Sequence, residues 1–401
     1  MKICDLTQFY SPLSGGVKRY VHEKIAYIQK HTTSDEHVLV VPGPRTDVVT
    51  SERSKIYSIH SPLLSRASRS RALLNLREVD EILAKEQPDI IESSDPYQIG
   101  WRALRTGREL NIPVVAFYHS HFPEAYLRST EKFLGRRAGA AVMKFARHYV
   151  RDLYNRFQVT LAPSEALAAV LQDWGVRNVR PVGLGVDTET FKPEPDDRKA
   201  TRISLGNLGK RTLLLYVGRL APEKNTATLC AAFADLEARR PGQYQLLVIG
   251  DGPQRDAVLE RQRKGDSVTW IRYCADSSDL ARYYRAADLF VHPGVQETFG
   301  LVALESQACG TPVVGIQGSY MDRIILHDQR GWARENSGAA LSEAIETFSR
   351  NLPARPAAEM SDLASRLHSW PRVFEQLFCI YREVAQNTPR HDGIGIYHSQ
   401  L

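Results

Sequence analysis

Residues 289–305 read LFVHPGVQETFGLVALE, and this stretch indicates how the whole chain is built. The apolar run Leu289–His292 predicts a buried strand, residues 293–300 predict a loop, and Leu301 begins a helical pattern. A strand that leads through a short loop into a helix is the repeating unit of α/β proteins. The segment therefore predicts a parallel sheet with a helix beginning at a strand's carboxyl end.

The same unit recurs along most of the chain, with helical patterns between most of the strand-like runs. This alternation predicts two successive doubly wound units, each a mostly parallel sheet covered by helices on both faces. The strand-like runs are Lys2–Leu6, His37–Val41, Lys55–Ile59, Asp89–Ile91, Val114–Tyr118 and Val159–Ala162, then Thr212–Val217, Gln245–Ile249, Val268–Arg272, Leu289–His292 and Pro312–Val314.

The alternation breaks at residues 188–211, which we interpret as a linker followed by an irregular entry into a second domain. After Pro356 the pattern is purely helical. We expect a domain at residues 1–190, a second at 191–370, a helix at 371–390 that packs back toward the first domain, and a loosely held tail at 391–401. Ligands of parallel sheets bind beyond the carboxyl ends of the strands, so both units should present loops to a central cleft.

Composition limits the classes of protein that remain. Of 401 residues, 43% are hydrophobic and 24% are charged, which argues against global disorder. No apolar segment reaches the roughly 20 residues of a membrane helix, and the first residues do not resemble a secretory signal. Five scattered cysteines without a CxxC pair favour reduced thiols in a cytoplasmic protein and argue against structural zinc. The net charge of +6 suits an anionic partner.

Two further strand ends carry groups suited to phosphate. Gly15 and Gly16 follow the first strand and precede a helix, so the backbone could approach a diphosphate closely. A turn that needs positive φ explains two glycines equally well. Arg219 and Lys224 follow the run Thr212–Val217, where a guanidinium and an ammonium could bind phosphate oxygens. Two solvated loop charges are the alternative.

Glu297 and Glu305 flank the start of the helix in the opening segment. The first-turn amides of Phe299, Gly300 and Leu301, followed by that of Val302, form a natural seat for an anion. Carboxylates beside such a seat can accept the hydroxyls of a sugar or ribose. A hydrolase acid/base pair is disfavoured, because the helix start between the two attracts an anion. A helix cap with a buried ion pair is the structural alternative.

Taken in order, these features resemble the family 4 retaining glycosyltransferases, which have the GT-B fold of two Rossmann-like domains. The resemblance covers roughly residues 1–335 and is most specific at the E-x7-E motif from Glu297 to Glu305. Further landmarks are Gly15-Gly16, the Arg219/Lys224 pair, Gly250-Asp251-Gly252-Pro253 and Gly183-Leu184-Gly185-Val186-Asp187.

The resemblance implies transfer of a hexose from a nucleotide diphosphate sugar, UDP- or GDP-linked, with retention and without a metal or other cofactor. It implies catalytic roles for Glu297 at the donor sugar, for His119 beside it, and for Arg219 and Lys224 at the leaving diphosphate. His121 is a second candidate for the histidine. Glu305 would bind the donor ribose, and the remaining donor-binding residues would be Gly15, Gly16, Gly250, Phe299, Gly300 and Leu301.

Two departures from the family pattern leave the donor open. Leu184 stands where the family often has arginine, and residues 317–322 read QGSYMD where the donor loop often reads Gly-Gly-x-x-Glu. A nucleotide-sugar epimerase of the same fold is the alternative enzyme. A non-catalytic nucleotide-sugar binding protein is the alternative outside enzymes.

The segment 127–156 is rich in basic residues and also has apolar residues at helical spacing. Such a helix can lie on an anionic membrane, or it can pack its apolar stripe on the sheet. We therefore expect a lipid or saccharide acceptor and a cytoplasmic enzyme, peripheral at the inner face of the membrane in the lipid case. No nucleic-acid motif is present. The stripe is Leu134, Ala138, Ala141, Val142, Phe145, Tyr149 and Leu153, and a second basic region contains Arg53, Lys55, Arg66, Arg69 and Arg71.

Overall fold

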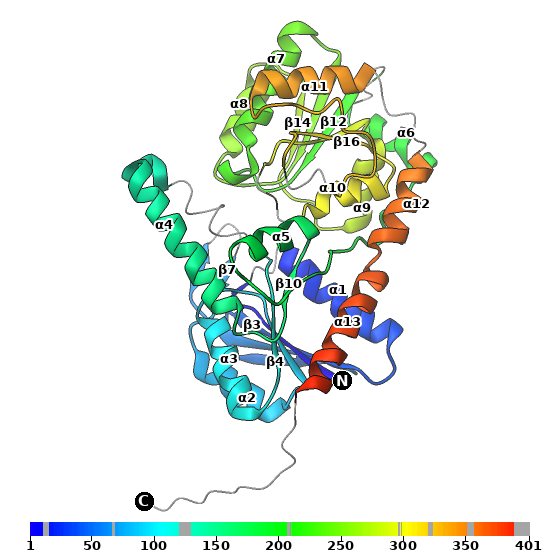
Figure 1. Cartoon of the computed structure of the whole chain (residues 1–401). Helices are drawn as coiled ribbons and strands as arrows, with labels where there is room; N and C mark the ends of the chain where they lie inside the picture. Colours follow the sequence, from blue (N-terminus) through cyan, green and yellow to red (C-terminus); the bar gives the residue numbers. More distant parts are fainter. Residues whose placement is uncertain are drawn as a thin grey trace, which may run out of the picture.

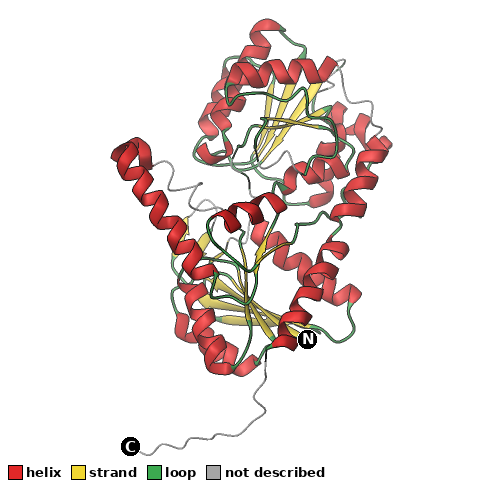
Figure 2. Ribbon diagram, viewed as in Figure 1, coloured by secondary structure: helices red, strands yellow, loops and turns green. Residues whose placement is uncertain are grey.

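We describe the protein from a computed structural model. The described residues are 1–10, 16–65, 69–119, 130–206, 209, 211–295, 297, 299–319, 324–350 and 357–388. Two sheets form the centres of two units, and helices cover both (Figures 1 and 2). This is the two-domain α/β arrangement that the strand–helix alternation predicts.

The first unit is built on an eight-stranded sheet, counted within the described residues, in the order β11-β10-β9-β8-β1-β3-β5-β4. All neighbours in it are parallel except β4 and β5. The strands are β1 (Lys2–Leu6), β3 (Glu36–Gly43), β4 (Asp47–Thr50), β5 (Ser54–His60), β8 (Ile90–Ser93), β9 (Val114–Phe117), β10 (Thr160–Ala162) and β11 (Val179–Pro181). A small antiparallel sheet contains β2 (Phe9–Tyr10), β6 (Leu63–Ser65) and β7 (Ser70–Ala72).

Both faces of the large sheet are buried, as expected for parallel strands. Ile3 of β1 and Val115 of β9 belong to the core on the side of α1, whereas Cys4 and Val114 belong to the core on the other side. The helices of this unit are α1 (Gly16–His31), α2 (Leu76–Glu86), α3 (Gln98–Leu110), α4 (Thr130–Tyr154) and α5 (Glu165–Asp173).

The second unit is built on a parallel sheet in the order β14-β13-β12-β15-β16. Its strands are β12 (Thr212–Val217), β13 (Tyr244–Ile249), β14 (Val268–Ile271), β15 (Leu289–His292) and β16 (Val313–Gly315). Its helices are α6 (Pro195–Ser204), the 3-10 turn η2 (Pro222–Lys224), α7 (Thr226–Arg239), α8 (Arg255–Arg263), α9 (Ser277–Ala286), α10 (Leu301–Ala308) and α11 (Gly338–Arg350).

The last two helices return the chain to the first unit. Helix α12 (Ala357–His368) contacts α10, and α13 (Trp370–Asn387) packs beside α1 (Figure 1). The backbone crosses between the units where the N–H of Val186 donates to the carbonyl of His368 at 2.8 Å. The expected tail at 391–401 lies outside the described residues.

One expectation was wrong. Residues 188–211 are not only a linker, because α6 occupies Pro195–Ser204 and packs on α9. Arg202 Nη1 donates to the Asp288 carboxylate at 2.9 Å, and Arg198 Nη1 donates to the Arg285 carbonyl at 2.9 Å. The helix is held largely by charged side chains, so its sequence shows little apolar periodicity.

Candidate active site

The order of the second sheet brings two of the predicted loops together. Strands β12 and β15 are neighbours, so the loops at their carboxyl ends start side by side. Asn225, in the left-handed conformation with φ 59°, joins them: its side-chain amide donates to the Pro293 carbonyl at 2.8 Å and to the Asn336 side chain at 2.6 Å. The loop of Lys224 is thereby fixed against the loop of Glu297.

Lys224 and Glu297 form an ion pair across these loops. The side chain of Glu297 is largely buried, and its Oε1 lies 3.7 Å from His292 Nε2. Burial alone would raise the pKa of Glu297, but the charge and hydrogen bond of Lys224, with the nearby His292 ring, hold it well below its usual range. Glu297 is therefore a carboxylate acceptor and a poor general acid.

The start of α10 has the form of an anion seat. Gly300 precedes it with φ 90°, a conformation that favours glycine, and its carbonyl accepts the N–H of Ala303 at 3.0 Å. The amides of Leu301 and Val302 lie in the first turn, where helix geometry provides no intrahelical acceptor. The first turn carries no acidic side chain. Phe299 is buried, with its ring 6.0 Å from that of His368.

The start of α1 faces the start of α10. Gly16 opens α1, and a Cβ added to it would lie 3.7 Å from the Leu301 side chain. The first turn of α1 also lacks acidic residues. Two positive helix ends from different units thus converge on one place, which favours a multiply charged anion such as a diphosphate.

Glu305 lies just beyond this point, one turn into α10, and its side chain is almost completely buried. Arg19 of α1 forms an ion pair with Oε1, and the Tyr284 hydroxyl donates to Oε2 at 3.0 Å. Glu305 is thus an oriented carboxylate at the boundary between the units, where it could accept ribose hydroxyls.

Arg219 and Gly250, which were also predicted as site residues, make their contacts outside this cluster. The exposed side chain of Arg219 pairs with Glu223, and its carbonyl accepts the Tyr216 hydroxyl at 3.0 Å. A Cβ on Gly250 would lie 1.8 Å from the carbonyl oxygen of Gly218, so this glycine is required for packing beneath the Arg219 loop. The geometry gives Gly250 a structural role next to the site.

His119 lies at the end of β9. Its ring stacks on Phe117 with centroids 4.1 Å apart and contacts the Tyr20 ring edge-on at 4.8 Å. Its Nε2 is buried and has no hydrogen-bond partner among the described residues. Burial, followed by the nearby Lys24 charge, lowers the pKa of His119 to about 3, against an opposing effect of Asp5. His119 is therefore neutral at physiological pH. Gly15 and His121 lie outside the described residues.

Sequence reasoning did not identify Arg19, Asn225, Tyr284 or His292 as site residues. Arg19 follows Gly16 by three residues, so its position one turn into the helix could have suggested it. Asn225 could have been suspected, because asparagine is common in left-handed turns. Tyr284 and His292 carry no comparable local signal.

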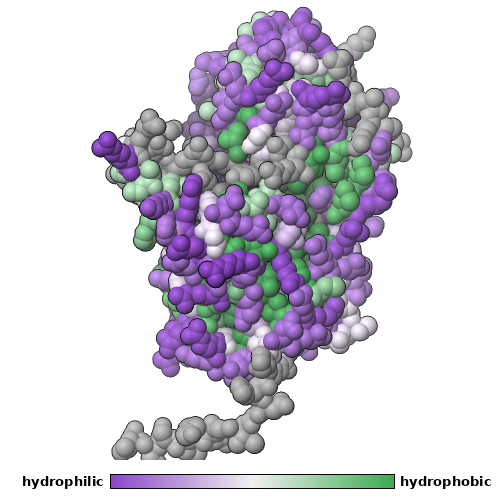
Figure 3. Space-filling model, in the orientation of Figure 1, coloured by the Kyte–Doolittle hydropathy of each residue, from purple (hydrophilic) through white to green (hydrophobic). Residues whose placement is uncertain are grey.

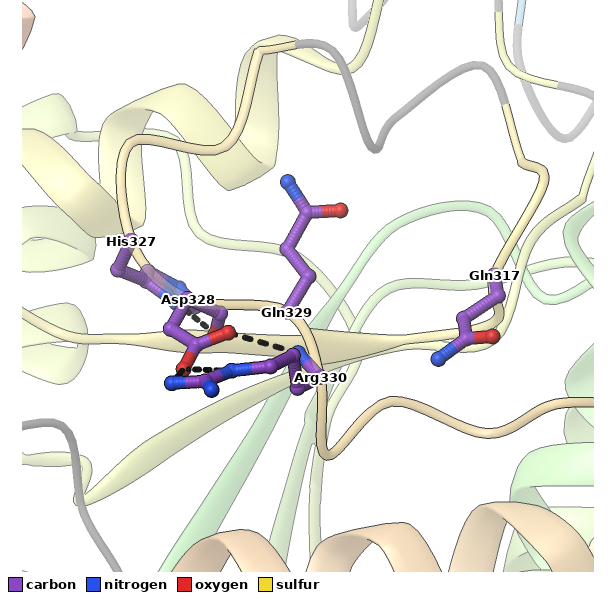
Figure 4. Close-up of a pocket in the computed structure, with 5 residues that line it drawn as sticks. All are labelled: Gln317, His327, Asp328, Gln329 and Arg330. Carbon is purple, nitrogen blue, oxygen red and sulfur yellow. Dashed lines mark hydrogen bonds and ion pairs between the residues drawn. The ribbon is translucent and has the colours of Figure 1, made fainter.

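The described residues contain no group of three or more histidine, cysteine or acidic side chains able to hold a metal ion. All five cysteines are free thiols. A hollow of about 380 Å³ lies beside Gln317, with His327, Asp328, Gln329 and Arg330 as its other lining residues (Figure 4). The exposed Asp328 and Arg330 pair with each other at 2.7 Å.

Helix α4 carries the predicted basic segment and projects from the first unit (Figure 1). Its second half packs on the sheet through Ala146, Val150 and Leu153, but Phe145 is 75% exposed. The expected stripe was therefore only partly correct, because Phe145 belongs to the free side. Hydrophilic and hydrophobic residues both appear on this helix in Figure 3. No helix among the described residues has the length and apolarity to cross a membrane.

Fold and site together define a two-domain GT-B glycosyltransferase. The model of the glycosyltransferase family 4 matches residues 14–190, and that of the glycosyl transferases group 1 matches residues 197–360. The chain therefore belongs to the family 4 glycosyltransferases and is an enzyme of that type.

Relatives and solved structures agree with this placement. The chain is 29% identical over 400 residues, 97% of this chain and 98% of the other, to a GDP-mannose-dependent alpha-(1-6)-phosphatidylinositol dimannoside mannosyltransferase of Mycobacterium tuberculosis. It is 29% identical to an alpha-monoglucosyldiacylglycerol synthase of Streptococcus pneumoniae, covering 86% of this chain and 78% of that protein. HepE of Anabaena, solved with UDP and glucose, superposes with a TM-score of 0.71 at 21% identity over 96% of this chain and 100% of that chain, which shows the fold.

Proposed function

We propose that this enzyme transfers a hexose from a nucleotide diphosphate sugar to the hydroxyl of a lipid-linked acceptor, with retention at the anomeric carbon. The observation that carries the proposal is the convergence of the starts of α1 and α10 beside the Lys224–Glu297 pair and Glu305. The helix ends and Lys224 would stabilise the departing diphosphate, and Glu305 would bind the ribose. Glu297 would accept hydroxyls of the donor sugar.

The site supplies its own positive charge, so we propose that the reaction needs no metal. Lys224, Arg219 and the two helix ends would neutralise the charge that develops on the leaving group. Activity that persists in excess EDTA supports this proposal, and activity restored only by added magnesium or manganese contradicts it.

The donor is tested first by binding. GDP-mannose is the first candidate, because relatives from Mycobacterium tuberculosis and Corynebacterium glutamicum are named as GDP-mannose-dependent mannosyltransferases. At about 100 times its dissociation constant, a ligand should stabilise the fold by about 2.7 kcal/mol, so a thermal-shift comparison with UDP-glucose identifies the donor class. Lys224→Met should abolish the shift. Lys264→Met is the matched control, because Lys264 pairs with Glu260 on the exposed surface of the same unit.

The products decide the reaction class. With a radiolabelled donor and a phosphatidylinositol- or diacylglycerol-based acceptor, we expect label in the lipid phase and an α-anomeric signal in the NMR spectrum of the product. A β-anomeric signal contradicts retention. Consumption of the donor without any acceptor would instead support the epimerase alternative.

For the acceptor, the free face of α4 supports a membrane surface. Phe145 is exposed next to the exposed cation Lys144, whereas Arg147 lies on another side of the helix and stacks on Trp174 at 5.3 Å. An aromatic side chain among cations is typical of helices that bind anionic lipid. We expect Phe145→Ser to weaken flotation with phosphatidylglycerol vesicles. Val49→Ser is the control, because Val49 is 63% exposed on β4, outside α4. Equal loss in both variants contradicts the assignment.

A further inference from the structure

A cluster of buried polar side chains lies behind His119 in the first unit, and the proposed reaction does not use it. Its members come from α1, from three adjacent strands and from the C-terminal helix α13, and all are at most 1% exposed. They are Asp5, Tyr20, Lys24, His37, Glu92 and Tyr381.

Lys24 is the centre of this cluster. Its ammonium lies 3.0 Å from the Asp5 carboxylate, 3.2 Å from Glu92 Oε1 and 2.9 Å from the Tyr381 hydroxyl. Tyr381 also donates to Glu92 Oε2, which links α13 to β8. His37 Nε2 lies 2.8 Å from Asp5 and completes the other side. Helix α13 is therefore bound to the sheet by polar bonds as well as by apolar packing.

Tyr20 connects this cluster to His119. Its hydroxyl donates to Glu92 Oε2 at 3.1 Å, while its ring meets His119 edge-on at 4.8 Å. On the side of α13 the same ring lies 5.9 Å from Phe374. The orientation of the His119 ring is thus set by Phe117, which lies on its own strand, and by Tyr20.

Burial of several charges contributes little net stability, because desolvation offsets the attraction between them, but it can fix one geometry. We propose that Tyr20 is a positioning residue for His119, and that the Lys24–Glu92–Tyr381 bonds make the docking of α13 a condition for that position. This inference rests on the proposed function, in which His119 would contact the donor sugar, as the family resemblance implies. It adds that the C-terminal helix α13, where the chain returns from the second unit to the first, controls the position of His119 in the first unit.

The charge of the cluster has a second consequence for His119. Tyr20 of α1 contacts the His119 ring, and the charges that act on it are those of Lys24 from α1 and Asp5 from β1. Glu92 of β8 and Tyr381 of α13 are bonded to Lys24. Lys24 disfavours a second positive charge, so the ring stays neutral and offers one nitrogen as donor and the other as acceptor. A neutral imidazole suits a hydrogen bond to a sugar hydroxyl.

The test removes single hydroxyls. Tyr20→Phe keeps the ring but loses the bond to Glu92, and Tyr381→Phe loses the link to α13. We expect each to lower kcat about five- to twentyfold with little change in the donor KM, because ground-state binding is retained. Tyr27→Phe is the matched control, because Tyr27 lies about two turns further along α1 and its ring packs on Phe374 and Phe378 of α13.

A double-mutant cycle separates positioning from general destabilisation. In a His119→Ala background, Tyr20→Phe should cause no further loss of kcat, since its effect passes through the histidine. An equal loss in both backgrounds overturns the proposal, as does a Tyr20→Phe enzyme that behaves like Tyr27→Phe.

An activity-independent readout keeps this inference distinct from the proposed function. In the ¹³C-imidazole NMR spectrum we expect the chemical shift of His119 to remain that of a neutral ring down to about pH 5. We expect this chemical shift to differ from wild type in Tyr20→Phe and in Tyr381→Phe. An unchanged signal overturns the proposal even if sugar transfer occurs. A wild type that transfers no sugar overturns the proposed function and leaves this spectral test in place.

Discussion

Two lysine–glutamate pairs, Lys24–Glu92 in the first unit and Lys224–Glu297 in the second, differ in their surroundings. Lys224 and Glu297 meet between two loops, and Lys224 remains 31% exposed. Lys24 and Glu92 are completely enclosed between α1, the sheet and α13. The Lys224–Glu297 pair can exchange partners with a ligand, whereas the Lys24–Glu92 pair is closed to ligands and can act only through the structure around it.

The pKa values of the two glutamates differ because the two lysines have different numbers of carboxylates beside them. Glu297 has Lys224 and His292 beside it, and its pKa is low. Glu92 must share Lys24 with Asp5, so burial and the repulsion from Asp5 outweigh Lys24 and raise the pKa of Glu92 to about 7. The pKa of Asp5 falls to about 2, because Lys24 and His37 outweigh its burial. One ammonium can fully stabilise only one of two adjacent carboxylates.

The largest expected effect is on activity at the accessible pair. Glu297→Gln keeps the shape of the side chain but removes the charge that orders Lys224 and accepts sugar hydroxyls. We expect kcat/KM to fall by about 10²–10³, as for the loss of a preorganised group that contacts the reacting centre. Initial rates with saturating acceptor measure it. Glu260→Gln, in the exposed pair with Lys264, should retain full activity. A Glu297→Gln enzyme within threefold of wild type contradicts the assignment.

Substitution in the enclosed Lys24–Glu92 pair should lower the stability of the fold. Lys24→Met leaves two buried carboxylates without their cation, and breaking a buried pair typically costs about 3–5 kcal/mol. Urea unfolding followed by tryptophan fluorescence measures the free energy of unfolding. Lys264→Met should change it by less than about 0.5 kcal/mol, as exposed substitutions usually do. A loss below 1 kcal/mol in Lys24→Met would show that the cluster is not closed to water.

A pH titration sharpens the comparison further. The pKa of Glu92 is higher in the folded chain than the ordinary 4.5, so the folded state binds the extra proton between about pH 4.5 and 7. Stability from this group is therefore present at low pH and is lost as pH rises through 7. The shift corresponds to about 3 kcal/mol at most. We expect the free energy of unfolding of Glu92→Gln to fall less steeply than that of wild type across this window, because Asp95, whose pKa burial raises to about 6, still titrates there. An identical slope in wild type and variant refutes the assignment.

The local pattern of apolar residues in the sequence predicted the strands that are buried on both faces. Strands β12 and β15 were predicted with their observed bounds, because a strand buried on both faces is a continuous apolar run. Helix α6 was missed because arginine–aspartate pairs, and not an apolar face, hold it. The free side of α4 was missed because periodicity does not reveal whether a stripe has a partner.

Candidate site residues could be predicted where each directly follows a strand. The prediction was incomplete where residues of the two units meet. Lys224 and Glu297 each follow a predicted strand end, so the edge of the sheet could be inferred from sequence. The Arg19–Glu305 pair joins residues 286 positions apart, and the Lys24–Tyr381 bond joins residues 357 apart. Contacts between residues so far apart in the sequence depend on where the chain passes from one unit to the other and back, and on how this places α1. No local sequence pattern contains that information.

The smallest expected effect concerns Arg19, which combines features of both pairs. Like Lys224 it is partly exposed, at 30%, and like Lys24 it holds a buried glutamate. The Tyr284 hydroxyl also orients Glu305, so Arg19→Ala removes only part of the positioning. We expect the dissociation constant of the donor nucleotide to rise three- to tenfold, about 1 kcal/mol, with kcat nearly unchanged; isothermal titration calorimetry measures it. Tighter binding would contradict this expectation. Because the ribose would then have to displace Arg19 from Glu305, that result would make the ion pair a competitor of the donor.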